Sequence, residues 1–514
     1  MIVRSPLSDV EIPDVALSAF VLGDATARGD RAALIDGPSG RTISYGELAQ
    51  GVRACAAGLA ARGLEPGQVV GLFSPNLPEY AVVFHGIASA GGAVTTINPL
   101  STADELARQL EAAGARFLVT APPFAATATT AAARAGVEEV FVFGQADGAT
   151  PFAELLDDPA AAPDLRIDSA QHIVALPFSS GTTGLPKGVM LTHRNLVANV
   201  VQSNALLEAD EDDVVIGVLP FFHIYGMTVI MNLALRYGAT VVTMPRFDLE
   251  EFLRLHQDHR VTRSYIVPPI ALALAKHPLV DQFDLSALDI VMSGAAPLSA
   301  ELAEAAAARL DCTVLQGYGM TETSPVTHVS PHDRNKPGSV GVLTPNTEAL
   351  IVDIDSGAPV APGARGELCV RGPQIMKGYL NNPDATAAMI DEDGWLHTGD
   401  IATVDDEGYF FIVDRLKELI KYKGYQVAPA ELEALLLEHP QISDVAVIGR
   451  PDPDAGEIPV AFVVAEQLEP DAVMQFVAER VAPYKRVRAV RFVERIPKSA
   501  SGKILRRELV DAEH

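Results

Sequence analysis

The feature that most constrains the fold is an alternation of two kinds of segment between about residues 30 and 330. Short apolar stretches rich in β-branched residues recur there, such as QVVGLF (68–73), RFLVT (116–120) and RSYIVPP (263–269). Between them lie Ala- and Leu-rich stretches with helical spacing, such as ELARQLEAAGA (105–115). Strands that alternate with helices are typical of α/β folds with largely parallel sheets. We therefore expect an α/β architecture.

The pattern changes twice in the rest of the chain. From about Gly338 to Asp414 the helical spacing fades, and strand candidates such as GELCVRG (366–372) are separated by Gly, Pro and Asp turns, which predicts a β-rich subdomain. Toward the C-terminus the helix candidate AELEALLLEH (430–439) precedes further strand candidates, which predicts a small α/β domain. The polar segment between the two, residues 414–426, is typical of a surface hinge.

Composition excludes several classes of function. The 514 residues are 48% hydrophobic and carry a formal net charge of −27, which favours a large globular protein and argues against nucleic acid or anionic lipid as a partner. Its three cysteines, Cys55, Cys312 and Cys369, lack the spacing of a disulfide framework or a zinc site. The charged and Pro-containing N-terminus does not resemble a signal peptide. We expect a cytoplasmic protein, either a monomer or a homodimer.

One uncharged segment, residues 214–235, is long enough to cross a bilayer. Pro220 and His223 interrupt it, its first part is β-branched, and another strand-like stretch follows closely. These features favour a buried strand, loop and helix over a membrane span.

The stretch SSGTTGLPKG (179–188) has the composition of a phosphate-binding loop. It fails the Walker A pattern, because two residues separate Gly184 from Lys187 and Gly188 follows the lysine. A Gly-rich turn can still direct backbone N–H groups and hydroxyls at phosphate oxygens. An ordinary surface turn is the alternative for this stretch taken alone.

Lysines are few and clustered. The chain has ten, none before Lys187, while arginine supplies most of the positive charge. Lys417, Lys421 and Lys423 fall together in the hinge segment, and Lys503 lies in PKSASGKILRR (497–507). Lysines concentrated in Gly-containing segments indicate positions that need a compact ammonium charge, with accidental clustering as the alternative.

Two further stretches add groups that suit a nucleotide. QGYGMTE (316–322) sets glycines around Tyr318, an aromatic face for a base, and ends in Glu322, a carboxylate for a hard cation. WLHTGD (395–400) ends in Asp400, a carboxylate of the kind that binds ribose hydroxyls. Alone, each could be a helix start or a turn. Together with the Gly-rich loop they predict phosphate, metal, base and ribose contacts.

Six ordered motifs carry a family resemblance over nearly the whole chain: SSGTTGLPKG, SGAAPL (293–298), QGYGMTE, WLHTGD, DRLKELIKYKGYQVAPAELE (414–433) and PKSASGKILRR. They resemble the adenylate-forming superfamily of acyl-CoA synthetases, luciferases and adenylation domains, and most of all the 4-coumarate:CoA ligases. The resemblance implies an N-terminal domain (1–414) of two α/β subdomains plus a β-barrel (about 338–414), a hinge (415–417) and a mobile C-terminal domain (418–514). It also implies ATP, Mg²⁺ and coenzyme A, used to convert a carboxylic acid to acyl-AMP and then to a thioester.

The resemblance assigns expected roles to individual residues. The residues expected to bind the β- and γ-phosphates of ATP are Ser179, Ser180, Gly181, Thr182, Thr183 and Lys187. Thr321 is expected to bind the α-phosphate, and Glu322 to bind magnesium. Adenine is framed by Gln316, Gly317 and Tyr318, and the ribose by Asp400 and Arg415. Lys503 stabilises the charge that develops during adenylation. Lys417 is the hinge residue, Lys421 and Gln426 contact the adenylate in the second step, and CoA meets Arg246, Lys423 and Gly424. A lone histidine is more often a core residue, but the resemblance predicts that His223 gates the second step.

The resemblance also predicts an acyl pocket lined by Phe222, Tyr225, Val229, Gly294, Ala295, Gly317, Pro325, Val326 and Val329. Small residues at positions 294, 295 and 317 are expected to leave room for a flat ring, which suits cinnamate, 4-coumarate or caffeate. Thr327 and Phe222 depart from the plant-like pattern, so a medium-chain fatty acid or another aryl acid is the alternative. A carrier protein in place of CoA is the alternative acceptor, and the segment KYKGYQ (421–426) favours CoA.

Overall fold

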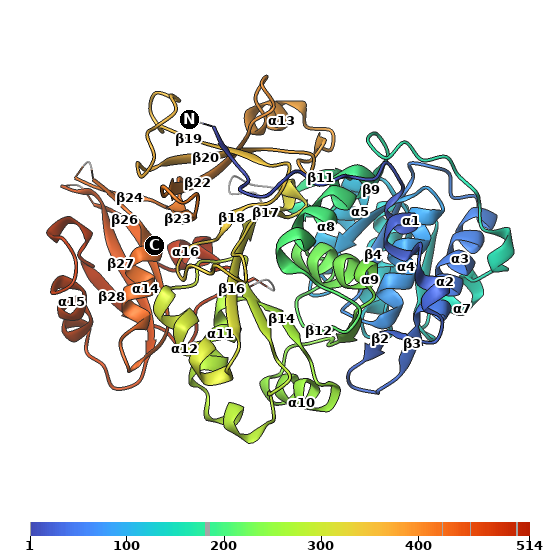
Figure 1. Cartoon of the computed structure of the whole chain (residues 1–514), viewed down its shortest axis with the longest axis horizontal. Coiled ribbons are helices and arrows are strands. Elements are labelled where there is room, and N and C mark those ends of the chain that lie inside the picture. The colour runs from blue at the N-terminus through green and yellow to red at the C-terminus, as the bar shows by residue number, and fades with distance from the viewer. Residues whose placement is uncertain (1, 180–185, 424, 453, 500–501, 514) are drawn as a thin grey trace.

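The computed structural model describes residues 2–179, 186–423, 425–452, 454–499 and 502–513 (Figure 1). The chain builds three sheets up to Arg415 and a fourth from Ile420 onward. The first two sheets alternate with helices along the sequence, and most of their strand pairs are parallel. The α/β class predicted from the sequence is confirmed.

The first sheet contains the stretches QVVGLF and RFLVT as its central strands. Its strand order among the described residues is β10-β11-β9-β5-β4-β6-β7-β8, with β21 on the far side of β11. The strands are β4 (Val69–Phe73), β5 (Ala93–Ile97), β6 (Ala115–Thr120), β7 (Glu139–Val142), β8 (Thr150–Pro151), β9 (Ile173–Ala175), β10 (Phe178–Ser179), β11 (Lys187–Thr192) and β21 (Gly378–Tyr379).

The second sheet has the order β18-β17-β16-β15-β14-β12-β13-β2-β3 among the described residues. Its strands are β2 (Ala32–Asp36), β3 (Thr42–Ser44), β12 (Val214–Gly217), β13 (Thr240–Thr243), β14 (Arg263–Ile266), β15 (Ile290–Ser293), β16 (Thr313–Gly319), β17 (Val326–Val329) and β18 (Val342–Leu343). The uncharged segment lies here as β12, a loop, the π-helix η3 (Gly226–Asn232) and helix α9 (Leu233–Tyr237). In the part of the chain that the structure describes, every helix is too short or too polar to cross a bilayer.

Helices cover and separate these two sheets. Helices α4 (Pro78–Ser89) and α8 (His193–Leu207) each touch strands of both, so one apolar core runs through the body. Side-chain caps define several helix starts: Ser44 with Glu47 for α3 (Tyr45–Ala61), and Thr102 with Glu105 for α5 (Ala103–Ala113), each satisfying backbone N–H groups that a helix start leaves open. The other helices of the body are α1 (Leu17–Leu22), α2 (Ala25–Arg28), α6 (Ala125–Ala135), α7 (Phe152–Leu155), α10 (Leu249–His259), α11 (Pro268–Lys276), α12 (Ala300–Leu310) and α13 (Pro383–Met389).

The β-rich stretch predicted over about residues 338–414 forms an antiparallel sheet, β1-β19-β20-β22-β23, at the top of Figure 1. The N-terminal strand β1 joins its edge, a pairing between distant segments that the sequence pattern did not indicate. The strands are β1 (Val3–Arg4), β19 (Glu348–Val352), β20 (Gly366–Arg371), β22 (Leu396–Val404) and β23 (Phe410–Arg415).

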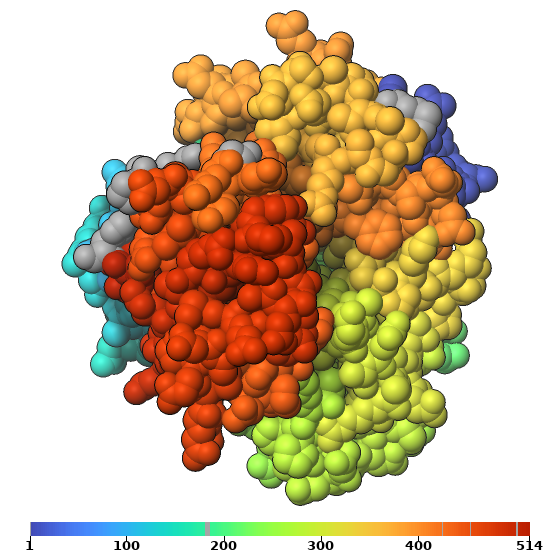
Figure 2. All heavy atoms as spheres, turned by 90° about the vertical axis from the view of Figure 1, so that its left-hand side faces the viewer, coloured from blue at the N-terminus to red at the C-terminus, as the bar shows by residue number. Residues whose placement is uncertain are grey.

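The C-terminal segment folds around its own sheet, ordered β25-β24-β27-β26 with β28 on β27, and has its own core. Its strands are β24 (Ile420–Tyr422), β25 (Tyr425–Val427), β26 (Ile442–Asp452), β27 (Gly456–Ala465) and β28 (Ala489–Phe492), and its helices are α14 (Pro429–Leu437), α15 (Pro470–Ala478) and α16 (Arg506–Glu513). Figure 2 shows this domain, in red, covering one side of the body. At the contact, the α11 residue Lys276 donates through Nζ to the Leu437 carbonyl at 3.4 Å.

Candidate active site

The ends of two parallel strands bring the first predicted residues together. Strands β15 and β16 pair in register, so Ser293 lies opposite Gln316, and Gly317 and Tyr318 follow where β16 continues beyond β15. Gln316 Nε2 and Ser293 Oγ are buried and have no hydrogen-bond partner among the described residues. Buried polar atoms are nearly always paired in native proteins, so these two are suited to contacts with a bound molecule.

Tyr318 and Asp400, from different sheets, meet directly. The Tyr318 hydroxyl donates to Asp400 Oδ2 at 2.5 Å, and Arg415 Nε lies 3.4 Å from Asp400 Oδ1. Asp400 is only 6% exposed, and this burial raises the pKa of its carboxyl, against the opposing charge of Arg415. Asp400 and Arg415 also face each other across β22 and β23. The structure therefore brings the predicted base and ribose residues to one place.

Lys503 enters this site from the C-terminal domain. The turn that carries it packs closely against the body. A Cβ atom added to Gly502 would lie only 2.9 Å from Val267 Cγ2. Burial, followed by the nearby charge of Arg415, lowers the pKa of the Lys503 ammonium to about 8, and the carboxylates of Glu418 and Asp400 oppose this. A half-buried cation thus stands beside the predicted ribose residues.

The charge of Lys503 affects the pKa of His223. Burial and then this charge lower the pKa of the His223 imidazole to about 4, so it is neutral at pH 7. Its Nδ1 accepts from the Tyr225 backbone N–H at 3.3 Å, which leaves the proton on Nε2. In this arrangement the ring can donate a hydrogen bond through Nε2, but that nitrogen is not available as a base.

Glu322 lies at the other side of the site, in a short 3₁₀ turn with Thr321. It is 5% exposed, and its Oε1 accepts from the Ser179 hydroxyl at 3.1 Å and from the Tyr379 hydroxyl at 2.8 Å. Lys187 Nζ stands over the Tyr379 ring, 4.9 Å from its centroid. The other predicted loop residues, Ser180, Gly181, Thr182 and Thr183, lie outside the described residues, as does Gly424.

Tyr379 is a site residue that the sequence reasoning missed. It joins Glu322 to Lys187 because β21 pairs with β11, although nearly two hundred positions separate the two strands. Burial and the charge of Glu322 raise the pKa of its phenol, so the hydroxyl stays protonated and donates. No local pattern around residue 379 signals this contact.

The predicted acyl-pocket residues lie in and around η3, β15, β16 and β17. Tyr225, Val229, Gly294, Pro325, Val326 and Val329 are buried, Phe222 is half-buried and Ala295 is exposed. A Cβ on Gly294 would meet the Tyr225 ring at 2.9 Å, and one on Gly317 would meet Met292 Cε at 2.2 Å. Tyr225 and Met292 therefore pack directly against these two glycines, and the pocket for a flat ring stays a prediction.

The remaining predicted residues lie on the segment after β23, on the β24–β25 hairpin and after β13. Lys421 and Gln426 are cross-strand neighbours on the β24–β25 hairpin, and both are exposed. Lys423 follows the first strand of that hairpin and has a positive φ of 49°. Lys417 is exposed in the turn between β23 and β24, and Arg246 is exposed after β13.

Comparison with known proteins places this site in a family. The model of the AMP-binding enzyme family matches residues 23–380, and that of the AMP-binding enzyme C-terminal domain matches residues 431–503. The chain is 48% identical to 4-coumarate–CoA ligase 5 of Oryza sativa subsp. japonica, over 98% of this chain and 96% of that protein.

Solved structures agree with the sequence relatives. The anthranilate CoA ligase AuaEII, in complex with anthranoyl-AMP, superposes with a TM-score of 0.90 at 26% identity, covering 98% of both chains. ATP-bound MatB from Rhodopseudomonas palustris gives 0.88 at 29% identity, covering 97% of this chain and 99% of that one. The chain therefore belongs to the AMP-binding, adenylate-forming enzyme family and is a 4-coumarate–CoA ligase-like member of it.

Proposed function

We propose that the protein is an AMP-forming acid–thiol ligase that activates a hydroxycinnamate-type acid with ATP and transfers the acyl group to coenzyme A. The observation that carries this proposal is the 48% identity to a 4-coumarate–CoA ligase over almost the full length of both chains. The meeting of Tyr318, Asp400, Arg415 and Lys503 supports it, because Tyr318 lies in the first matched range and Lys503 in the second.

The described residues fit a nucleotide and a magnesium ion. In this proposal Asp400 and Arg415 bind the ribose, and Gln316 Nε2, which has no partner among the described residues, binds the base. The buried carboxylate of Glu322 is a hard oxygen ligand of the kind that Mg²⁺ prefers. When bound there, magnesium would neutralise phosphate charge. Lys187 lies over the ring of Tyr379, whose hydroxyl donates to Glu322, and in this proposal it holds the leaving phosphates.

The first half-reaction needs positive charge more than proton transfer. The substrate carboxylate attacks the α-phosphorus, the bond to the bridging oxygen breaks, and pyrophosphate leaves with the electron pair. The charges of Lys503 and Asp400 influence each other in the ligand-free protein, so in this proposal the ammonium already lies in the nucleotide site before substrate binds. A preorganised cation in a poorly hydrated site stabilises developing negative charge strongly.

The second half-reaction exchanges one leaving group for another. The CoA thiol gives its proton to water, its sulfur attacks the acyl carbon of acyl-AMP, and AMP leaves with the electron pair of the broken acyl–oxygen bond. His223 borders the predicted acyl pocket through Tyr225 and carries no charge at pH 7. Its contact with Tyr225 and its response to the charge of Lys503 support the predicted gating role, in which the ring must move before the thiol enters.

A substrate screen tests the proposal. The purified protein is given ATP, Mg²⁺ and CoA with cinnamate, 4-coumarate, caffeate, benzoate or straight-chain fatty acids, and consumption of free CoA thiol and release of AMP are measured. We expect a hydroxycinnamate to give the highest kcat/KM. A ranking led by fatty acids would contradict the substrate class. Acyl-AMP formation without thioester would contradict CoA as the acceptor.

A further inference from the structure

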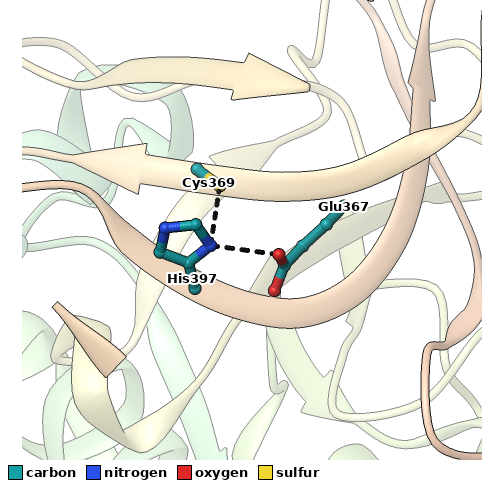
Figure 3. A group of neighbouring side chains, drawn as sticks. All are labelled: Glu367, Cys369 and His397. Atoms are coloured by element: carbon teal, nitrogen blue, oxygen red, sulfur yellow. Dashed lines mark hydrogen bonds and ion pairs between the residues drawn. The ribbon is translucent and has the colours of Figure 1, made fainter. Parts of the chain in front are cut away.

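Three chemically different side chains lie together beside the strand that carries Asp400 (Figure 3). Glu367 and Cys369 come from β20 and His397 from β22. Residues two apart on a strand share a face, and Cys369 is the cross-strand partner of His397. The register shifts between Glu367 and Cys369, so the ladder is irregular at the point where Glu367 faces the end of the WLHTGD stretch.

Both oxygens of Glu367 have partners in this group. A carboxylate only accepts hydrogen bonds, so His397 Nδ1–H donates to Glu367 Oε2 at 3.0 Å. The Gly399 backbone N–H donates to Oε1 at 3.0 Å. The opposite ring nitrogen, His397 Nε2, lies 3.7 Å from Asp391 Oδ2. His397 is therefore oriented from two sides, and it in turn orients the Glu367 carboxylate toward Gly399.

Gly399 immediately precedes Asp400 and adopts a positive φ of 69°, a region that non-glycine residues rarely occupy. The preceding residue is also tied to β20: the Thr398 hydroxyl donates to the Leu368 carbonyl at 2.7 Å and accepts from the Asp400 N–H at 3.0 Å. Gly399 itself is held at both backbone groups: its N–H donates to Glu367 Oε1, and its carbonyl accepts from the Leu416 N–H at 2.9 Å. The direction in which the Asp400 carboxylate points depends on this backbone turn.

We propose that Glu367 and His397 are positioning residues for the nucleotide, and that they act through Gly399 to aim the Asp400 carboxylate at the ribose hydroxyls. The proposal rests on the proposed function, which makes Asp400 a ribose ligand. Glu367 does not touch the nucleotide in this account. Its loss leaves the Gly399 N–H without its acceptor and frees the turn, so the energetic effect is confined to contacts made with the 2′ and 3′ hydroxyls.

A zinc site is the competing reading of the same group, because Glu, Cys and His are zinc ligands and their ligand atoms lie within 4.8 Å of one another. Here Cys369 Sγ is 3.4 Å from His397 Nδ1. The hydrogen-bonded reading is favoured because Glu367 Oε1, Glu367 Oε2 and His397 Nδ1 all have protein partners already. A metal ion would have to displace the His397 contact.

The test compares ATP with 2′,3′-dideoxy-ATP, which lacks the hydroxyls that Asp400 would bind. Binding of each nucleotide is titrated into the wild type, Glu367→Ala and a control, Glu348→Ala, which removes an arginine-paired carboxylate from the neighbouring strand. We expect Glu367→Ala to weaken ATP about tenfold, in line with the loss of a hydrogen bond to a charged group, and dideoxy-ATP less than about twofold. Glu348→Ala should change neither.

Equal weakening of both nucleotides, or no change in either, would overturn the proposal. If the wild type binds no ATP at all, the proposed function itself fails, which is a separate outcome. Glu367→Gln, which keeps an acceptor oxygen for Gly399, should recover part of the ATP affinity, and it preserves the test if Glu367→Ala does not fold. In an Asp400→Ala background, Glu367→Ala should add no further loss. Retention of one zinc ion per chain after dialysis against Zn²⁺, lost in Cys369→Ser, would overturn the hydrogen-bonded reading.

Discussion

The C-terminal domain presents two lysines that differ in almost every physical respect. Lys503 lies half-buried against the body beside Asp400 and Arg415, and its pKa is lowered to about 8. Lys421 stands exposed on the β24–β25 hairpin, opposite Gln426. A desolvated charge acts strongly over a short distance, whereas water screens an exposed one. Of these two lysines, Lys503 alone is positioned in this arrangement to assist chemistry at the nucleotide site.

This contrast indicates which half-reaction the structure suits. With Lys503 near the residues predicted to bind the ribose, this arrangement suits the proposed adenylation step. The family resemblance assigns Lys421 to the second step, and an exposed Lys421 must then be brought in by movement of the domain about the predicted hinge at Lys417. Each prediction below tests whether the two lysines divide the reaction in this way.

The largest effect is expected from Lys503→Ala. Acid-dependent exchange of pyrophosphate into ATP should fall about 10²- to 10³-fold, the usual cost of losing one charge-stabilising group. Thioester formation from supplied acyl-AMP and CoA should stay within about twofold, because that step starts after the α-phosphate has reacted. The control is Lys498→Ala. Lys498 lies in the same segment as Lys503 but is paired with Asp444. An equal fall in the rates of both half-reactions would contradict the assignment of Lys503 to adenylation alone.

Lys421→Ala should give the reverse pattern with a smaller effect. We expect thioester formation from acyl-AMP to fall about tenfold or more, the loss of one contact from a charged group, while pyrophosphate exchange stays within about twofold. Lys485, paired with Glu431 elsewhere in the domain, provides the matched Lys485→Ala control. If Lys421→Ala impairs exchange instead, the hairpin has been assigned to the wrong step.

The pH dependence should sharpen the comparison. The Lys503 ammonium is charged below its pKa of about 8 and neutral above it, so kcat/KM for ATP in the exchange assay should fall about tenfold per pH unit at higher pH. Cinnamate is the substrate of choice because it has no phenol to titrate. In Lys503→Arg, whose guanidinium stays charged, the remaining activity should not fall near pH 8. The same fall of kcat/KM with pH in Lys503→Arg would mean that a group other than Lys503 causes the pH dependence.

The smallest effect is expected at the hinge. Lys417→Pro fixes φ and removes a backbone N–H in the turn between β23 and β24. Single-turnover experiments should show thioester formation slowed several-fold more than adenylation, because only the second step requires rotation of the domain. Equal slowing of the two steps would remove the reason to place the hinge at residue 417.

Sequence patterns predicted the fold well where local periodicity determines structure. The stretches QVVGLF, RFLVT and RSYIVPP became β4, β6 and β14, and the uncharged segment became β12, η3 and α9. Contacts set by long-range strand register were not predictable in this way. Tyr379 reaches Glu322 only because β21 pairs with β11, and Glu367 reaches Gly399 only because β20 pairs with β22.

The acyl pocket shows a different limit of sequence reasoning. Glycines at 294 and 317 indicate space, but the direction of a neighbouring side chain decides whether that space is open. Tyr225 lies over Gly294 because its hydroxyl donates to the Met292 carbonyl at 3.1 Å, and Met292 lies over Gly317. Rotamers of large side chains depend on packing from several segments at once, which no local pattern records.

The most direct test of the two-lysine account is chemical labelling of lysine side chains, read by mass spectrometry in two states of the enzyme. One state holds the acid with a non-reactive ATP analogue, and the other holds acyl-AMP with a CoA analogue that lacks the thiol. We predict that Lys503 is protected in the first state and reactive in the second, while Lys421 shows the opposite change and Lys485 shows none. Protection of both Lys503 and Lys421 in the same state, or no change in either, would contradict the account.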